Sequence, residues 1–244
     1  MLRNYKSEFD ARVEFISDYI KKSGAAGIVF GNSGGKDCTL VGILCKAACM
    51  NTVGIIMPCL SRRNYEEDMT DGLALAKQYG IETRTIDLSE LKTNAVKTIG
   101  EHTELNNNAL TNITPRLRMI TLYAVAASEN RIVAGTDNRS EIYMGYFTKW
   151  GDGGYDFNPI ADLTVTEVYE FLAFLGAPYD IIKKAPSAGL FEGQTDENEM
   201  GISYAKIDDY LLNSNANNED KTLIESYHNK SAHKRKMPVT YTEE

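Results

Sequence analysis

The chain has 244 residues, 43% of them hydrophobic, with a mean hydropathy of -0.33, so it is long enough for one domain with a full core over residues 1–244. Its 26 Lys and Arg against 34 Asp and Glu give a net charge of -8, which argues against broad attachment to nucleic acid or to an anionic membrane and leaves only a local basic site open. Residues 1–27 mix charge throughout and no run approaches the length of a membrane span, so we expect a cytoplasmic protein.

Apolar spacing predicts helices and strands in alternation over the first 135 residues. The predicted order is a helix from Tyr5 to near Gly24, a strand at 26–30, a helix at 40–50, a strand at 52–57, a helix at 65–79, a strand at 82–88, a helix at 114–130 opened by Thr114 and Pro115, and a strand at 131–135. This alternation is typical of a doubly wound α/β fold with a mainly parallel sheet and flanking helices, whose ligands lie at the carboxyl ends of the strands.

The pattern changes after Thr136. We expect a helix near 164–175, a long polar loop at 186–201 of the kind that often covers a binding site, a helical segment at 203–231 with a polar interruption, and a loosely held tail from 236.

The four cysteines stand at positions 38, 45, 49 and 59 without a C-x-x-C pair, and the chain has only three histidines, so no zinc-site spacing is present. A helix after Gly35 would place Cys38, Cys45 and Cys49 on one face, which predicts that they pack in the core.

The glycine-bearing turn from Gly31 to Cys38 lies between a predicted strand and a predicted helix, where free backbone N–H groups and the helix dipole favour an anion. It is not a Walker A loop, because Phe30 and Asp37 stand at two required positions, and Ser33 breaks the dinucleotide fingerprint. The nucleophile elbow of a serine hydrolase does match at 31–35. Such an elbow normally follows several strands, however, whereas one helix and one strand precede this turn.

Asp37 is the residue of the turn that indicates which ligand it binds. A carboxylate one turn into a phosphate-binding helix repels the phosphate unless a divalent cation joins the two, as Mg²⁺ commonly does. The turn therefore predicts a nucleoside triphosphate with Mg²⁺. The alternative is a strand-to-helix turn with Asp37 as a helix-start carboxylate and no ligand.

The same turn is similar to the pyrophosphate loop of the N-type ATP pyrophosphatases, and strings further along resemble ammonia-dependent NAD synthetase in the family's order. The resemblance covers nearly the whole chain. The strings are at 116–119, 135–141, 145–149, 151–154, 158–163, 186–190, 193–197 and 201–204.

The resemblance implies an adenine nucleotide alpha hydrolase-like fold and a ligase that forms a carbon–nitrogen bond. The nicotinate carboxylate of deamido-NAD attacks the α-phosphate of ATP and releases pyrophosphate, and ammonia then displaces AMP to give NAD. It also implies Mg²⁺ and a homodimer with its active sites at the subunit interface. Because the match fills the chain, free ammonia is the expected donor, unless a separate glutaminase chain docks.

The resemblance assigns the site residue by residue, with Ser33 as a hydroxyl donor and not a nucleophile, and with His233 and Lys234 reaching the dinucleotide across the dimer interface. The ATP residues are Gly31, Asn32, Ser33, Gly34, Gly35, Lys36, Asp37, Cys38, Thr136 and Ser187; the deamido-NAD residues are Arg116, Lys149, Asp156, His233 and Lys234; the Mg²⁺ residues are Asp37 and Glu141. Taken without the resemblance, Arg116 is an ordinary exposed charge, Lys149 and Asp156 a surface ion pair, and 233–236 a solvated basic tail.

Three departures from the family pattern matter. Residues 61–64 differ from the commoner family pattern, which bears on the adenine and ribose contacts. Cys38 stands where the family usually has Ser, and Val165 stands where it often has a Lys that contacts ATP. Lys36, Arg62 and Arg63 are candidates to replace that charge. Three other functions stay open from the sequence: an amidating or thiolating enzyme with another acceptor, a nucleotide-binding module without turnover, and the serine hydrolase.

Overall fold

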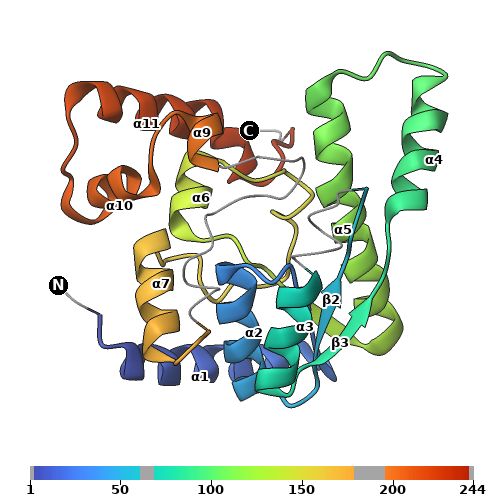
Figure 1. Cartoon of the computed structure of the whole chain (residues 1–244), viewed down its shortest axis with the longest axis vertical. Coiled ribbons are helices and arrows are strands. Elements are labelled where there is room, and N and C mark those ends of the chain that lie inside the picture. Colours follow the sequence, from blue (N-terminus) through green and yellow to red (C-terminus); the bar gives the residue numbers. More distant parts are fainter. Residues whose placement is uncertain (1–2, 61–68, 179–195, 242–244) are drawn as a thin grey trace.

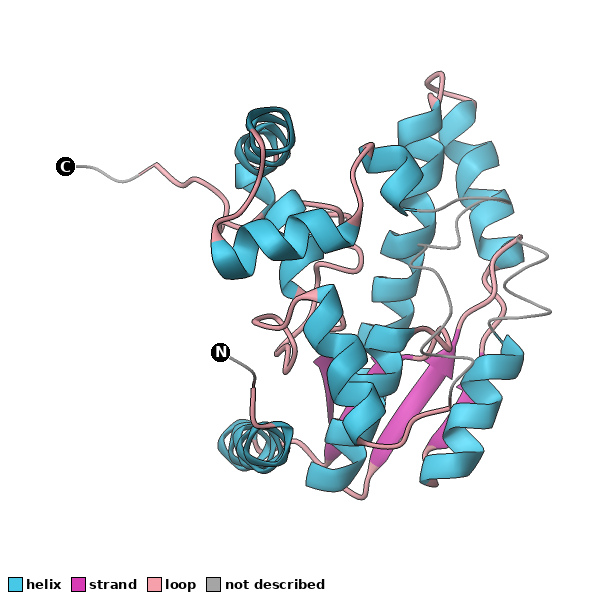
Figure 2. Ribbon diagram, turned by 60° about the vertical axis from the view of Figure 1, so that its left-hand side comes forward, coloured by secondary structure: helices cyan, strands magenta, loops and turns pink. Residues whose placement is uncertain are grey.

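The centre of the fold is a four-stranded sheet in the order β3-β2-β1-β4, in which every neighbouring pair is parallel (Figures 1 and 2). The computed structural model describes residues 3–60, 69–178 and 196–241. The strands are β1 (Gly27–Gly31), β2 (Thr52–Ile56), β3 (Glu82–Thr85) and β4 (Arg131–Ala134). The chain runs outward from β1 to β3 and then crosses back to β4, which confirms the predicted doubly wound α/β fold.

Helices connect the strands and follow the last of them (Figure 1). None of the helices in the described ranges combines the length and hydropathy that crossing a membrane requires. The helices are α1 (Tyr5–Ser23), α2 (Lys36–Ala48), α3 (Met69–Tyr79), α4 (Ser89–Gly100), α5 (Asn107–Glu129), α6 (Arg139–Met144), α7 (Val165–Phe174), α9 (Asp196–Met200), α10 (Tyr204–Asn213), α11 (Asn218–Lys230) and the 3₁₀ turn η2 (Ala232–Lys234).

Alternate residues of β1 point to opposite faces of the sheet and belong to different apolar clusters. Ile28 and Phe30 pack with side chains of α1, α2 and α7. Val29 packs with Val133 of β4 and Ala126 of α5. The central strand is therefore buried on both faces, as its unbroken apolar sequence indicates.

A third apolar cluster joins α6 and the start of α7 to the C-terminal helices. Its members include Met144, Val165, Ile207 and Ile224. In Figure 1, α10 and α11 lie together at one corner of the molecule, and α4 and α5 form a pair at the opposite side. This cluster fixes the C-terminal third of the chain against the segment that follows β4.

The predicted start of the helix before β4 was wrong. The helix begins at Asn107, with the Asn106 side chain accepting from Ala109 N, and Pro115 lies inside it. The stretch before Thr114 is polar and has only a weak apolar period, so Pro115 was interpreted as the first helical residue. Asn106 is the stronger N-cap signal. Helices α4, α6 and α9 were not predicted; α9 occupies 196–200 of the predicted loop, and 186–195 of that loop lie outside the described residues.

Candidate active site

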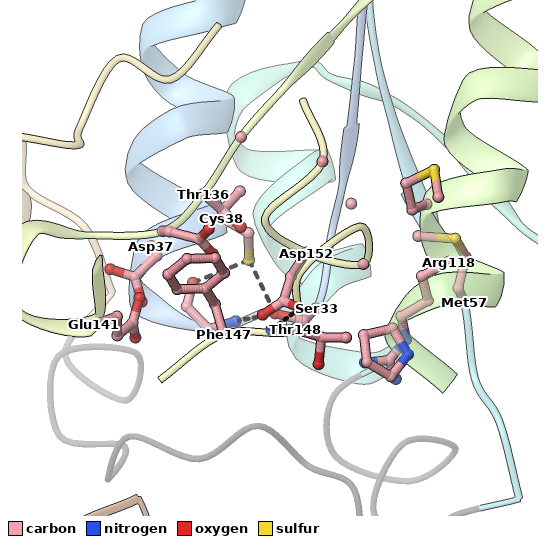
Figure 3. A pocket seen from close by; sticks show the side chains of 18 of the residues that line it. Ser33, Asp37, Cys38, Met57, Arg118, Thr136, Glu141, Phe147, Thr148 and Asp152 are labelled. Atoms are coloured by element: carbon pink, nitrogen blue, oxygen red, sulfur yellow. Dashed lines mark hydrogen bonds between the residues drawn. The ribbon is translucent and has the colours of Figure 1, made fainter. Parts of the chain in front are cut away.

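A cavity of about 410 Å³ opens at the carboxyl ends of β1, β2 and β4. Its lining includes most of the glycine turn, the segment after β4, residues of α5, and the loop at 145–154. Figure 3 shows Asp37 and Glu141 side by side at one end and Met57 and Arg118 at the other. The position agrees with the rule that open parallel sheets bind ligands beyond the carboxyl ends of their strands.

The glycine turn is held by the Asn32 side chain. Its Nδ2 donates to the Gly72 carbonyl at 2.9 Å, and its Oδ1 accepts from Gly34 N at 3.3 Å. Gly34 has a φ of 73°, a conformation that glycine adopts without strain. The turn thus presents the N-terminus of α2 to the cavity, and Ser33 is exposed there.

Cys38 is buried behind the turn and borders the cavity. Its thiol donates to the Gly35 carbonyl at 3.1 Å and lies 3.3 Å from Ser33 Oγ. Burial raises the pKa of this thiol, so it stays protonated near neutral pH. Cys45 is also buried and Cys49 partly so, and all four cysteines are free, which confirms the packing predicted for this face of the helix.

Asp37 and Glu141 meet at the ammonium group of Lys36. Lys36 Nζ lies 2.7 Å from Asp37 Oδ2 and 3.6 Å from Glu141 Oε1. Burial, followed by the nearby Asp37 carboxylate, raises the pKa of Glu141 to about 8, although Lys36 opposes that shift. Burial alone would lower the pKa of Lys36, but the two carboxylates outweigh it and hold that pKa above its usual range.

Asn138 positions both carboxylates from the end of β4. Its Nδ2 donates to Asp37 Oδ1 at 3.1 Å, and its Oδ1 accepts from Glu141 N at 3.0 Å. Glu141 Oε2 in turn accepts from Asn138 N, so the two residues form a capping box at the start of α6. The short helix is thereby anchored with its first acidic residue facing α2.

The lining of the cavity suits a cation in addition to a phosphate. Its described side chains are more often acidic than basic, and burial raises the pKa of Asp137 well above its usual range, with the charges of Asp152, Glu141 and Asp37 adding to the effect. Within the described ranges no cluster of three potential metal ligands occurs. A carboxylate pair is nevertheless what Mg²⁺ usually needs when substrate phosphates and water complete its shell. The acidic residues are Asp37, Asp137, Glu141, Asp152, Asp196 and Glu199, and the basic ones Lys36, Arg118 and Lys234.

Thr136 and Lys234, two further predicted site residues, also border the cavity. Lys234 donates to the carbonyls of Gly145 and Phe147, at 2.8 and 2.7 Å, so it lies against the cavity of its own chain. Predicted residue Ser187 and the candidate cations Arg62 and Arg63 lie outside the described residues.

The remaining predicted residues lie beyond the cavity lining. Arg116 donates to the Lys149 carbonyl at 3.4 Å, and Lys149 Nζ donates to the His233 carbonyl at 2.8 Å, so these three residues are neighbours. Asp156 accepts from Val133 N and from the Tyr123 hydroxyl, at 2.7 and 3.0 Å. Lys149 and Asp156 therefore have different partners and do not form the surface ion pair that their sequence proximity suggested.

The serine-hydrolase alternative is wrong. All three histidines are in the described ranges, and none borders the cavity that Ser33 faces. His228 stacks on Tyr143 and contacts the Tyr143 carbonyl. Ser33 therefore has no histidine beside it, whereas a serine hydrolase with a nucleophile elbow uses a histidine base.

Several lining residues had no predicted role, among them Arg118, Asp137 and Asp152. Asp137 directly follows Thr136, and Arg118 lies two residues beyond Arg116 on α5. The signals that point to them are this proximity and the family-like strings at 116–119, 135–141 and 151–154, which contain all three residues. Whether a helix position faces a cavity depends on how that helix packs, which the sequence pattern does not define.

Comparison with known proteins gives a consistent result. The family model described as NAD synthase matches residues 8–238. The NH(3)-dependent NAD(+) synthetase of Alkaliphilus oremlandii is 45% identical, with 98% of this chain and 98% of that protein covered.

Two solved structures resemble the whole chain. The NMN synthetase from Francisella tularensis has a TM-score of 0.93 and 38% identity, covering 99% of this chain and 100% of that one. The NH3-dependent NAD synthetase from Campylobacter jejuni has a TM-score of 0.82 and 28% identity, with 99% and 100% covered. The match over nearly the entire length, together with the glycine turn and its paired carboxylates, means that this chain belongs to the NAD synthase family.

Proposed function

We propose that this chain is an ammonia-dependent NAD synthetase, a ligase that amidates deamido-NAD at the expense of ATP. The observation that supports it best is the meeting of the glycine turn with Asp37 and Glu141 in one cavity. Full-length similarity to a protein named NH(3)-dependent NAD(+) synthetase supports the same reaction.

ATP binds with its phosphates at the N-terminus of α2, where backbone N–H groups of residues 31–38 and the Ser33 hydroxyl donate to them. Asp37 and Glu141 hold Mg²⁺, which when bound neutralises charge on the phosphates and on the departing pyrophosphate. Thr136 at the end of β4 and Ser187 add contacts to the nucleotide. A free carboxylate does not react with ammonia at neutral pH because oxide is a poor leaving group, and adenylation supplies a better one.

Deamido-NAD lies beside ATP, along the segment that links the cavity to the C-terminal turn. Lys234 borders the cavity, and Arg116, Lys149 and His233 are neighbours of one another beyond its rim. Asp156 completes the proposed set for the dinucleotide. We further propose a cytoplasmic homodimer whose active sites lie at the subunit interface, with residues 1–244 forming one domain.

A shorter acceptor is the second candidate. The solved structure with a TM-score of 0.93 is named NMN synthetase, and amidation of a nicotinate mononucleotide requires the same adenylation chemistry. Its 38% identity to this chain exceeds the 28% of the NAD synthetase from Campylobacter jejuni, which favours testing the mononucleotide beside the dinucleotide.

Product analysis by mass spectrometry tests the two acceptors directly. The protein is mixed with Mg²⁺-ATP, ammonium at mildly alkaline pH, and either deamido-NAD or nicotinate mononucleotide. NAD with equal amounts of AMP and pyrophosphate supports the proposal, and preferential formation of NMN supports the second candidate. If both acceptors are recovered unchanged, neither assignment holds.

The Asp37→Ala variant separates an enzyme from a binding module. We expect it to lose Mg²⁺-dependent turnover, because one of two metal carboxylates and a partner of Lys36 disappear. A module that binds nucleotide without turnover has no activity to lose, so absence of turnover in the parent protein with retained ATP binding would contradict the enzyme.

A further inference from the structure

Lys36 is a buried cation inside the phosphate-binding turn. It is the first residue of α2, it is only 6% exposed, and it borders the cavity. A buried ammonium group is costly unless it is paired, and here its two partners are Asp37 and Glu141. The side chain therefore points into the site, where a surface lysine would point to solvent.

In the described part of the chain, two aromatic side chains, Tyr204 and Tyr169, lie near the Lys36 ammonium group. Its Nζ lies 5.8 Å from the centre of the Tyr204 ring, which is itself 3% exposed and packed in the C-terminal apolar cluster. Lys36 also borders the cavity, beside the turn that we propose for the ATP phosphates.

The same two carboxylates are the proposed ligands of Mg²⁺. A divalent cation and an ammonium group compete for them, because both neutralise the same pair of negative charges. With Asp37 and Glu141 holding the metal, the Lys36 ammonium group would lose its partners, and the ATP phosphates would offer it new oxygens in the cavity.

We propose that Lys36 is a counterion that changes partners. In the nucleotide-free protein its ammonium group pairs with Asp37 and Glu141, and when Mg²⁺-ATP binds it pairs with the ATP phosphates instead. The inference rests on the proposed use of ATP and Mg²⁺ at this site. Lys36 thus holds the two carboxylates together, and it provides a positive charge for the phosphates that the backbone of the turn cannot supply.

This exchange predicts that the Lys36→Gln variant has a higher affinity for Mg²⁺ alone and a lower affinity for Mg²⁺-ATP. Without the competing ammonium group, Mg²⁺ alone binds more tightly, by about tenfold. Without a cation for the phosphates, Mg²⁺-ATP binds more weakly, by about 10- to 100-fold. A lysine that merely fills space would not shift the two affinities in opposite directions.

The experiment measures both affinities on the full chain by isothermal titration calorimetry, first with MgCl₂ alone and then with ATP at saturating Mg²⁺. Lys46→Gln is the matched control, since Lys46 lies in the last turn of the same helix and donates to the Met50 carbonyl. Lys36→Arg keeps the charge, and we expect its ATP affinity to stay within about threefold of the parent.

Opposite shifts in Lys36→Gln, absent from Lys46→Gln and largely reversed in Lys36→Arg, support the proposal. Unchanged affinities, a parallel loss of both, or an arginine variant that behaves like the glutamine variant would each overturn it. These titrations need no turnover, so they remain informative if NAD is not formed, and a parent protein that binds Mg²⁺-ATP but makes no NAD refutes only the proposed reaction.

Discussion

The Asn138 side-chain amide donates to Asp37 Oδ1 at 3.1 Å, linking the end of β4 to the first turn of α2. Asn138 is fully buried and also caps α6: its side chain contacts the Asp37 carboxylate and accepts from Glu141 N, while its backbone N–H donates to the Glu141 carboxylate. Asp37 and Asn138 are about a hundred positions apart in the sequence, and they meet at the edge of the sheet where β1 and β4 end together.

Asn138→Ala should therefore lower stability and activity together. Loss of the helix cap and of the donor to Asp37 costs about 1–3 kcal/mol in free energy of unfolding. Loss of carboxylate orientation lowers kcat/KM by about 10- to 100-fold. Urea unfolding and steady-state kinetics measure the two effects. Asn217→Ala is the control, because the exposed Asn217 caps α11 away from the cavity lining, so its loss should cost about 1 kcal/mol without changing kcat/KM.

Cys38→Ser tests the thiol that stands where the family usually has serine. A hydroxyl is the better donor and fits the same contacts to Gly35 and Ser33, so we expect an intact fold and a KM for ATP equal to the parent's or lower by about threefold. A rise of tenfold in that KM would show that the sulfur atom itself is needed.

The rate at which Cys38 is alkylated depends on pH. Its pKa lies above that of an exposed cysteine because of burial, so the thiolate that reacts with iodoacetamide forms only at higher pH. In peptide mapping by mass spectrometry between pH 7 and 9, the partly buried Cys49 should be alkylated before Cys38. Faster labelling of Cys38 at pH 7 would contradict this order.

Val165→Lys restores the residue that the family often carries at this position. We expect a lower KM for ATP, because the Lys that the family often has at this position contacts ATP, although Val165 itself does not border the cavity. We also expect a loss of about 1–3 kcal/mol in stability, since Val165 is 4% exposed within the apolar cluster that contains Tyr204. Initial rates against ATP concentration and thermal unfolding measure these effects, and unchanged ATP kinetics would refute the first.

Gly145→Ala should unfold or strongly destabilise the segment that holds Lys234. Gly145 has a φ of 66°, and an added Cβ would lie 2.1 Å from Ser231 Cβ. We expect a loss of more than about 3 kcal/mol, with weaker binding of substrates at the 145–148 loop. Gly24→Ala is the control: its φ of 69° is similar and nothing lies within 4 Å, so only the backbone strain of about 1 kcal/mol applies.

The helices and strands with strong local signals were predictable. The apolar run of β1, the helix that ends at Gly24, and the glycine turn before α2 each follow from short-range sequence, because capping, side-chain periodicity and turn chemistry act over a few residues. The start of α5 was mispredicted because Pro115 is a strong local signal that the longer helix tolerates within its interior.

The sequence by itself determined the fold class, the family resemblance, and the loop with Asp37 as the place where phosphates and a cation belong. Only the tertiary structure decided that Lys36 points inward between Asp37 and Glu141, that Asn138 joins them, and that Lys234 lies against its own chain's cavity. The reason is physical: the contacts of Lys36 with Glu141, of Asn138 with Asp37 and of Lys234 with Gly145 join residues 105, 101 and 89 positions apart. Their geometry depends on the register of β4 beside β1 and on the packing of the C-terminal helices.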